Sequence, residues 1–265
     1  MIITSKVIKE ELINNLKIKY ESVKKTLVII NQNKDLATEK FINSKKRLAD
    51  TLNVKVDIRK LDLNVSKEEI IEILRNIEQD KQVNGVIVQL PINNHKEILK
   101  NIPVKKDIDC LSPYNLGLFM RGQSTFIPPV VYGVDKMLKE LNKNVKGKKV
   151  LIIGAGILTG EPLTSYFMQK QAEVMVVNEF VSDLAAITKQ ADIIISATGV
   201  CHLIGNNHIT SGQLLIDLGG GSLDGKLVGD INTQQVSETA DVIPVPGGIG
   251  PLTVIGIFEN LILTQ

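Results

Sequence analysis

The chain has 265 residues, 43% of them hydrophobic, and a formal net charge of +2, which suffices for one large or two moderate domains. Dispersed Lys and Glu residues exclude the basic block of a nucleic-acid-binding protein, and apolar runs shorter than ~18–20 residues exclude a membrane span. No signal-peptide pattern opens the chain, and its two cysteines lack metal-ligand spacing. We therefore expect a soluble cytoplasmic protein.

Short β-rich runs alternate with helical patterns in the first half of the chain. We expect strands at 26–31, 54–61 and 85–89, and helices at about 4–24, 35–52, 67–80 and 94–101. This βαβ rhythm predicts a parallel sheet covered by helices. The stretch 107–123 contains Pro113, Gly117 and Gly122, so we expect it to be irregular.

One lysine lies on the apolar face of the helix predicted at 35–52. Asp35 provides the N-cap, and Lys45 falls four residues after Phe41 and three before Leu48, which places it among the core-facing side chains. An ammonium group in that position is costly unless it has a partner or a task. Two interpretations stay open: a stem that extends to solvent at the edge of the apolar stripe, or a catalytic lysine in a pocket wall.

The second half has the same rhythm. Pro128 and Pro129 open a predicted helix that runs to about residue 142 and connects two domains. Apolar strands of the fully buried kind are expected at 149–153, 173–177, 192–196 and 214–218. Residues 243–253 are too rich in Pro and Gly to be regular, and Pro251 is expected to open a terminal helix that ends near residue 263.

A glycine-rich turn follows the strand at 149–153. Gly154, Gly156 and Gly160 allow a tight turn, and the N-terminus of the next helix can bind a pyrophosphate. Glu179 follows Gly154 by 25 residues; its carboxylate can accept hydrogen bonds from an adenosine ribose and would repel a 2′-phosphate, which favours NAD over NADP. The alternatives are a structural turn without a ligand and a solvated glutamate.

Two further strand ends, Ser196–Gly199 and Asp217–Gly221, lie where doubly wound sheets bind their ligands. Asp217 and Asp230 could be functional, although aspartates at strand ends more often cap turns. The three histidines lie in loop-like contexts without mutual metal-ligand spacing, so we expect no metal site. They are His95, His202 and His208.

Four segments, in order along the chain, carry a resemblance to a known family: 85–91 (GVIVQLP), 106–109 (KDID), 113–117 (PYNLG) and 244–253 (PVPGGIGPLT). The sequence resembles the bifunctional methylenetetrahydrofolate dehydrogenase/methenyltetrahydrofolate cyclohydrolase family over nearly its whole length. The resemblance implies an α/β fold with two three-layer α/β domains flanking a cleft, the C-terminal one a Rossmann-like doubly wound parallel sheet. It also implies a homodimer.

The resemblance further implies a catalytic folate-binding domain at 1–125, on which the terminal helix 251–265 packs, and an NAD(P)-binding domain at 126–250. Lys45 would be catalytic, Gln89 would orient it, and Asp109 would anchor the pterin ring. The substrate would contact Phe41, Val88, Leu90, Pro246, Gly247, Gly248, Gly250, Pro251 and Thr253. The cofactor, NAD or NADP, would contact Gly154, Ala155, Gly156, Glu179 and Gly220.

The implied activity is the NAD(P)-dependent oxidation of 5,10-methylenetetrahydrofolate to 5,10-methenyltetrahydrofolate, followed by hydrolysis to 10-formyltetrahydrofolate. The first step chiefly requires that substrate and nicotinamide be oriented. The second requires proton movement, for which a desolvated lysine with a lowered pKa is suited.

Several residues near the implied sites depart from the family pattern. Phe41 replaces the usual tyrosine, Cys110 replaces a glycine after Asp109, and residues 128–131 (PPVV) replace Pro-Cys-Thr-Pro. Ala155 replaces an arginine, Glu161 replaces a residue that is often lysine, and Glu179–Phe180 replaces a frequent Ser-Arg pair. The loss of positive charge and the gain of negative charge disfavour NADP.

Two alternatives therefore stay beside the active enzyme. One is a degenerate paralogue that binds nucleotide or folate with little or no catalysis. The other is an NAD-dependent dehydrogenase of another small substrate.

Overall fold

The computed structural model describes residues 1–33 and 35–264, without the side chains of residues 36 and 37. It divides into two compact units. The five-stranded unit comprises Met1–Glu10 and Val130–Thr253, and the three-stranded unit comprises Glu11–Pro129 and Val254–Gln265. The division falls within α1 (Lys6–Tyr20) and α10 (Gly250–Leu263), and directly after the first residue of α6 (Pro129–Glu140).

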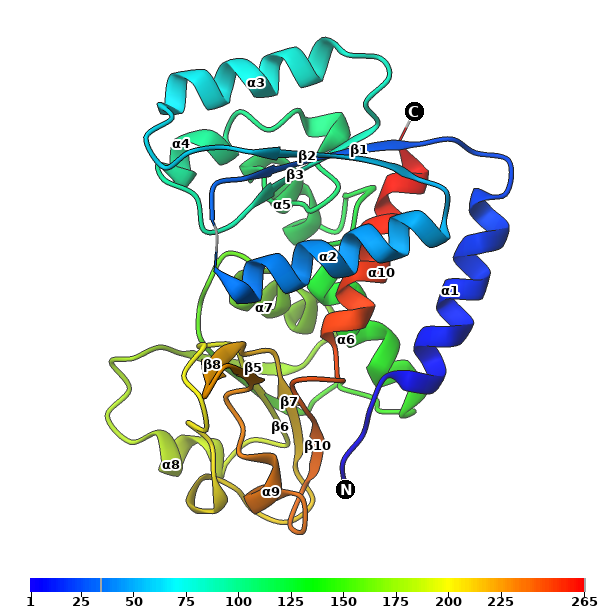
Figure 1. Cartoon of the computed structure of the whole chain (residues 1–265). Coiled ribbons are helices and arrows are strands. Elements are labelled where there is room, and N and C mark those ends of the chain that lie inside the picture. Colours follow the sequence, from blue (N-terminus) through cyan, green and yellow to red (C-terminus); the bar gives the residue numbers. More distant parts are fainter. Residues whose placement is uncertain (34, 265) are drawn as a thin grey trace. The chain divides into compact units, whose positions relative to one another are not determined.

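The three-stranded unit is built on a parallel sheet in the order β2-β1-β3. Its strands are β1 (Thr26–Asn31), β2 (Lys55–Lys60) and β3 (Gly85–Gln89), and its crossover helices are α2 (Leu36–Thr51) and α3 (Lys67–Gln79). The first crossover runs from β1 to β2, and the second runs back from β2 past β1 to β3. Because they run in opposite directions across the sheet, α2 and α3 lie on opposite faces of it (Figure 1). The predicted strands and helices are confirmed, with ends shifted by a few residues.

Local capping fixes where the crossover helices begin. The Asp35 side chain accepts a hydrogen bond from the Thr38 backbone N–H at 2.8 Å at the start of α2. Ser66 and Glu69 form a reciprocal capping box at the start of α3. In the sheet, Asn31 pairs with Gln89, so the carboxyl ends of β1 and β3 lie side by side where the strand order reverses.

Shorter helices complete this unit: α4 (His95–Leu99), the 3₁₀ turn η1 (Val104–Lys106) and α5 (Pro113–Met120). The prediction that 107–123 is irregular was wrong for α5. Ser112 caps this helix by accepting a hydrogen bond from the Asn115 N–H, and Pro113 occupies its first turn, where a missing N–H costs nothing. A methyl group at Gly117 would meet no described atom within 4 Å, and the chain leaves the helix before Gly122, whose φ is +66°.

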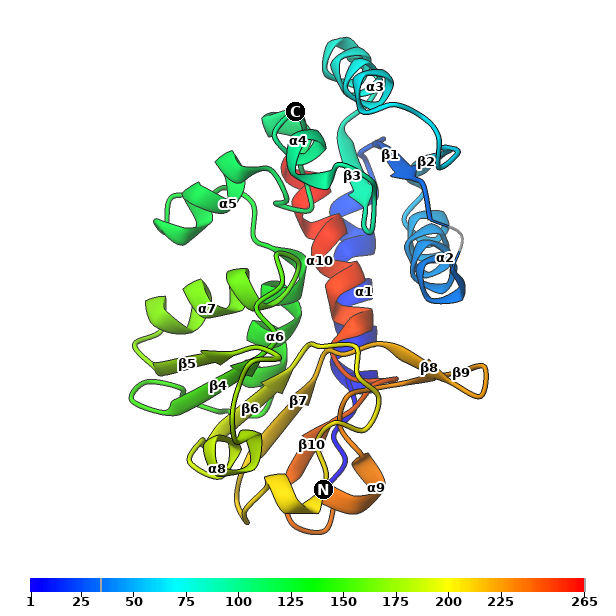
Figure 2. The ribbon, with the colours of Figure 1, turned by 90° about the vertical axis from the view of Figure 1, so that its left-hand side faces the viewer.

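The five-stranded unit contains a parallel sheet in the order β5-β4-β6-β7-β10 (Figure 2). This is the doubly wound order 2-1-3-4-5, whose direction reverses between β4 and β6. The strands are β4 (Lys149–Ile153), β5 (Glu173–Val177), β6 (Ile193–Ser196), β7 (Leu214–Asp217) and β10 (Asp241–Ile243).

Helices cover both faces of this sheet, with α6 and α7 opposite α8 and α9 (Figure 2). They are α6 (Pro129–Glu140), α7 (Gly160–Gln169), α8 (Leu184–Thr188), the 3₁₀ turn η2 (Asn206–His208) and α9 (Thr233–Val236). A hairpin, β8 (Gly221–Leu223) and β9 (Lys226–Val228), is inserted between β7 and α9. The helix predicted to open at Pro128 and Pro129 is confirmed as α6, which ends at Glu140. The terminal helix α10 begins at Gly250, one residue before Pro251.

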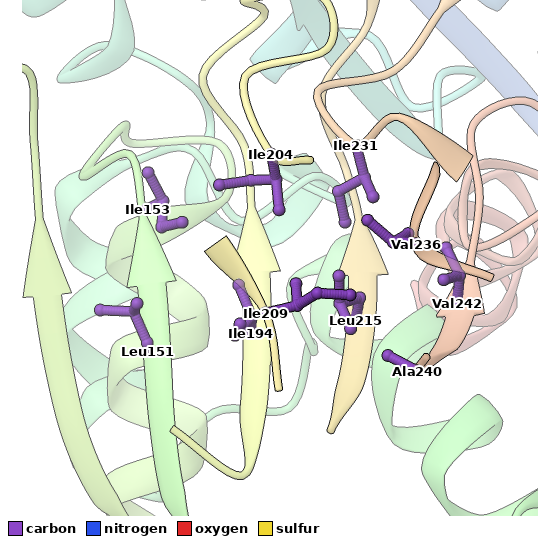
Figure 3. Packing of buried hydrophobic residues seen from close by; sticks show 10 residues of the cluster. All are labelled: Leu151, Ile153, Ile194, Ile204, Ile209, Leu215, Ile231, Val236, Ala240 and Val242. Atoms are coloured by element: carbon purple, nitrogen blue, oxygen red, sulfur yellow. The ribbon is translucent and has the colours of Figure 1, made fainter. Parts of the chain in front are cut away.

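The core on one face of this sheet joins the central strands to the loops that follow them (Figure 3). Leu151, Ile194 and Leu215 come from β4, β6 and β7, whereas Ile204 and Ile231 come from loops beyond the strands. The prediction that β5 is fully buried was wrong. It is the edge strand, and three of its five residues are exposed. No helix in the described part of the chain is long and apolar enough to cross a membrane.

Candidate active site and nucleotide site

Lys45 projects from α2 into the interior of the three-stranded unit, with 1% of its surface exposed. Its Nζ donates a 2.7 Å hydrogen bond to Oε1 of Gln89 at the carboxyl end of β3, and lies 4.8 Å from the centre of the Phe41 ring. The Gln89 amide is oriented because its Nε2 donates to the Leu90 carbonyl at 3.1 Å. The inward direction predicted for Lys45 is therefore confirmed. The alternative, a stem that extends to solvent at the edge of the apolar stripe, does not describe this side chain.

The surroundings of Lys45 favour its neutral form. Burial lowers the pKa of the ammonium group, and the negative charge of Asp109 opposes this shift. The same pair acts on Asp109, whose pKa burial raises and Lys45 lowers. A buried amine whose partner is a neutral amide can release its proton more readily than a solvated lysine. This arrangement suits a group that accepts and returns a proton.

Asp107, which sequence reasoning missed, holds the segment that carries Asp109. It is fully buried and accepts hydrogen bonds from the Leu111 N–H (3.1 Å), the Ser112 N–H (2.9 Å) and the Asn115 amide (3.0 Å). Burial nevertheless raises the pKa of its carboxyl group. A buried carboxylate with three donors fixes the turn that places Asp109.

Cys110 follows Asp109 in the left-handed region, with φ +56°. That conformation favours glycine, the residue that the family pattern has there. Its thiol is buried, and burial raises its pKa.

The other predicted substrate residues are divided between the two units. Val88 is buried in β3 and Leu90 follows that strand in the three-stranded unit. Pro246, Gly247, Gly248, Gly250, Pro251 and Thr253 lie in the five-stranded unit. There the Gly247 carbonyl accepts hydrogen bonds from the backbone and hydroxyl of Ser5, at 3.0 and 3.1 Å.

The glycine-rich turn after β4 combines two packed glycines with an open one. Gly154 has φ +101°, and a methyl group on it would lie 2.5 Å from the Ala197 carbonyl oxygen. A methyl group on Gly160 would lie 2.1 Å from the Gly154 carbonyl oxygen, whereas one on Gly156 would meet no described atom within 4 Å. The outer glycines thus close the turn, and Gly156 leaves the backbone accessible to a ligand.

An open hollow of ≈ 230 Å³ lies beside this turn, at the carboxyl end of β5. Its lining residues are Ala155, Val176, Val177, Asn178, Phe180 and Val181. Phe180 is 84% exposed, and the Asn178 side chain accepts a hydrogen bond from the Phe180 N–H at 3.1 Å. Glu179, which was predicted from the sequence to contact the cofactor, is exposed but does not line the hollow. Its neighbours Asn178 and Phe180 do line it, and the sequence did not single them out as cofactor contacts.

A nicotinamide dinucleotide fits this edge of the sheet. The register aligns Val177, Ile153, Ser196 and Asp217 at the carboxyl ends of four adjacent strands. The open Gly156 and the hollow lie at that edge, next to the point where the strand order reverses. Gly220, the remaining predicted contact, is exposed just beyond β7.

The histidines take no part in this arrangement. Nδ1 of His208 accepts a hydrogen bond from the Gly205 N–H, which closes a local turn. Within residues 1–33 and 35–264, no group of three or more His, Cys, Asp or Glu residues is placed to hold a metal ion.

One unit is a parallel α/β fold with a buried lysine beside a glutamine and an aspartate. The other is a doubly wound fold with a glycine-rich turn. Together they define a two-unit enzyme that depends on a nicotinamide nucleotide. Known proteins narrow this class. Residues 3–109 match the catalytic-domain model of tetrahydrofolate dehydrogenase/cyclohydrolase, and residues 128–265 match the NAD(P)-binding-domain model of the same family. The chain belongs to the tetrahydrofolate dehydrogenase/cyclohydrolase family, as its sequence motifs predicted.

Individual relatives agree with this assignment. The bifunctional protein FolD of Aquifex aeolicus is 37% identical over 239 residues, covering 88% of this chain and 82% of the relative. The crystal structure of the bifunctional FolD enzyme of Campylobacter jejuni has a TM-score of 0.93 at 29% identity, covering 100% of this chain and 98% of the other. The Trypanosoma brucei enzyme, solved with NADP and an inhibitor, has a TM-score of 0.90 at 25% identity, with coverages of 98% and 95%.

Proposed function

We propose that this enzyme oxidises 5,10-methylenetetrahydrofolate to 5,10-methenyltetrahydrofolate with a nicotinamide cofactor and hydrolyses the product to 10-formyltetrahydrofolate. The observation that carries the proposal is Lys45, which is hydrogen-bonded to Gln89 and buried in the unit that contains residues 11–109 of the family's catalytic-domain match. When bound, the nicotinamide ring accepts the hydride that the methylene carbon of the substrate releases.

Hydrolysis of the methenyl product is the step that needs the lysine. Water adds to the cationic carbon and loses a proton, which gives a neutral carbinolamine. The carbon–nitrogen bond on the pterin side then breaks as that nitrogen is protonated, and the hydroxyl proton is released to solvent as the formyl carbonyl forms. Neutral Lys45 can take the first proton and its conjugate acid can supply the second. In this scheme Gln89 keeps the amine in place, Asp109 accepts hydrogen bonds from the amino-pyrimidinone edge of the pterin, and Phe41 packs on the substrate.

We assign the folate chemistry to residues 1–125 with the terminal helix, and cofactor binding to residues 126–250. Support comes from the grouping of residues 11–129 and 254–265 in the unit that contains Lys45, although residues 1–10 group with the other unit. We also propose a cytoplasmic homodimer. The free state of Cys110 and Cys201 supports a reducing compartment, and light scattering of the purified protein would establish the oligomeric state.

NAD is the proposed cofactor. Among the described residues, no basic side chain lines the hollow beside the glycine-rich turn. Glu179 lies next in sequence to two of the lining residues, Glu161 follows the glycine-rich turn, and both are exposed. A 2′-phosphate would find no cation in that lining and would be repelled by the carboxylates. The cofactor contacts proposed are Gly154, Ala155, Gly156, Glu179 and Gly220.

The test is to assay purified protein with 5,10-methylenetetrahydrofolate and either NAD or NADP, following absorbance of the reduced cofactor and of the methenyl product. We expect turnover with a higher kcat/KM for NAD. In Glu179→Arg the NADP/NAD ratio of kcat/KM should rise by on the order of tenfold or more, because a repulsive charge becomes attractive. A wild type that prefers NADP would refute the cofactor choice. Ligand-induced stabilisation without either turnover would favour a catalytically inactive binding protein.

A further inference from the structure

The β8–β9 hairpin leaves and rejoins the five-stranded unit at the same carboxyl edge of the sheet as the proposed cofactor site. Asp217, the last residue of β7, is fully buried and closes the base of this hairpin. Its carboxylate accepts hydrogen bonds from the Gly219 N–H (3.1 Å) on the outgoing limb, and from the N–H groups of Asp230 (3.1 Å) and Ile231 (2.9 Å) on the returning limb. One side chain thus ties both limbs to the end of the strand.

A second buried carboxylate ties the hairpin base to the neighbouring strand. Oδ2 of Asp230 accepts hydrogen bonds from the Ser196 hydroxyl (2.7 Å), the Thr198 N–H (2.7 Å) and the Thr198 hydroxyl (2.9 Å). Ser196 ends β6 and pairs in register with Ile153, the residue before the glycine-rich turn. The hairpin is therefore connected to the point where the strand order reverses.

The two carboxylates also pack closely against two glycines, Gly219 and Gly229. A methyl group on Gly219 would lie 1.9 Å from Oδ1 of Asp230, and one on Gly229 would lie 2.0 Å from Oδ2 of Asp217. Ile231, next to Asp230, packs in the sheet core together with Ile204 (Figure 3). The hairpin base consequently has little freedom to move unless these contacts break.

The pair maintains this geometry at an electrostatic cost. Burial and the charge of Asp230 raise the pKa of Asp217 to about 7, against the effect of its backbone N–H donors. Oδ1 of Asp230 has no hydrogen-bond partner among the described residues. Two buried acids that repel each other therefore occupy a turn that neutral side chains could also cap.

We propose that Asp217 and Asp230 are positioning residues for the nicotinamide cofactor, because together they hold the Gly219–Gly221 turn against the ends of β6 and β7. The proposal rests on the cofactor site proposed above, which this turn borders through Gly220. Neither carboxylate contacts the reacting atoms in this scheme. Loosening the pair lets the turn move away from the cofactor and weakens cofactor binding, while the folate chemistry around Lys45 is left unchanged.

Two substitutions of Asp230 separate this role from a general contribution to folding. Asp230→Ala removes the acceptor of three hydrogen bonds, so the KM for the cofactor should rise on the order of tenfold to a hundredfold while kcat changes much less. Asp230→Asn can place its amide oxygen at the Oδ2 position and keep all three donors satisfied, because Oδ1 accepts none. It should restore the KM to within about threefold of the wild type.

Cyclohydrolase activity measured from 5,10-methenyltetrahydrofolate needs no nicotinamide and serves as the internal control. It should be the same in the wild type and both variants. If Asp230→Ala does not fold, Ser196→Ala/Thr198→Val removes two donors and keeps both carboxylates, and should raise the cofactor KM in the same way. An unchanged cofactor KM, or an equal loss of both activities, would overturn the proposal. A wild type without either activity would instead refute the proposed function.

Discussion

Replacing Lys45 by methionine tests the proposed chemistry most directly, because methionine keeps most of the unbranched stem and removes only the amine. General acid–base catalysis by a positioned side chain contributes about 10²–10⁴-fold, or about 3–5 kcal/mol of activation free energy. Lys45→Met should therefore lower cyclohydrolase kcat by that factor. The dehydrogenase step should fall less, because hydride transfer depends mainly on orientation.

The same substitution should have little effect on folding. The ammonium group donates one hydrogen bond, to Gln89 at 2.7 Å, and a hydrogen bond from a charged group contributes about 1.5–3 kcal/mol. Removing the amine also relieves the desolvation of a side chain that is 1% exposed, a penalty of several kcal/mol for a buried ion. The two effects oppose each other, so urea unfolding should show a free energy equal to or above that of the wild type.

The pH dependence has a defined sign. The folded pKa of Lys45 lies below its ordinary value because of burial, so unfolding takes up a proton between the lowered pKa and about 10.4. Stability from this group therefore increases as pH rises through that window, and the cyclohydrolase rate rises with the neutral amine over its lower part. Lys45→Met should lack both pH-dependent contributions.

Lys46→Met is the matched control, since Lys46 is exposed on the same helix. It should change neither activity nor stability by more than about 0.5 kcal/mol. If Lys45→Met keeps cyclohydrolase activity within about threefold of the Lys46→Met control, the assignment of proton transfer to Lys45 is wrong.

Four substitutions test the framework of the sites. Gly154→Ala should lower the free energy of unfolding in urea by at least about 1–3 kcal/mol, because φ is +101° and the new methyl group would strike the Ala197 carbonyl. Gly156→Ala should keep the stability of the wild type but weaken cofactor binding. Equal stability losses in the two variants would contradict this. Asp107→Ala should cost about 3 kcal/mol or more, because three buried donors lose their acceptor, and a loss below about 1 kcal/mol would count against its role. Because the folded pKa of Asp217 is about 7 and an unfolded aspartate has about 3.9, this group makes stability fall as pH rises from about 4 to 7. Asp230→Asn should reduce that fall in thermal melts by removing the repulsion, and an unchanged pH slope would show that the two carboxylates are not coupled.

Features that depend on local pattern were predictable from the sequence. Strands β1, β3, β4 and β5 have the predicted bounds, because apolar runs between polar turns specify both their position and their length. The inward direction of Lys45 follows from helical spacing alone. Its partner Gln89 lies 44 residues away in the sequence, so no local rule could identify it, and only the family resemblance suggested it.

The two failures have different physical origins, one in local capping and one in the order of the strands. Proline and glycine suggested an irregular stretch at 107–123, but Ser112 and the buried Asp107 supply caps and acceptors that make α5 favourable. Strand β5 has the composition of a buried strand and is exposed because it is the edge of the sheet. Strand order is a property of the whole unit and leaves no trace in a window of five residues.

The choice of partner for Lys45 explains how an interior lysine can take part in proton transfer. A carboxylate at the end of β3 would form an ion pair, stabilise the ammonium form and raise the pKa of the amine. Gln89 offers an oxygen of the same reach without a charge, so it positions the amine and leaves the effect of burial dominant. The negative charge of Asp109 moderates the shift by opposing the effect of burial. A glutamate in place of Gln89 would keep an acceptor within reach of the amine but would favour its protonated form, which makes Lys45 a poorer proton acceptor.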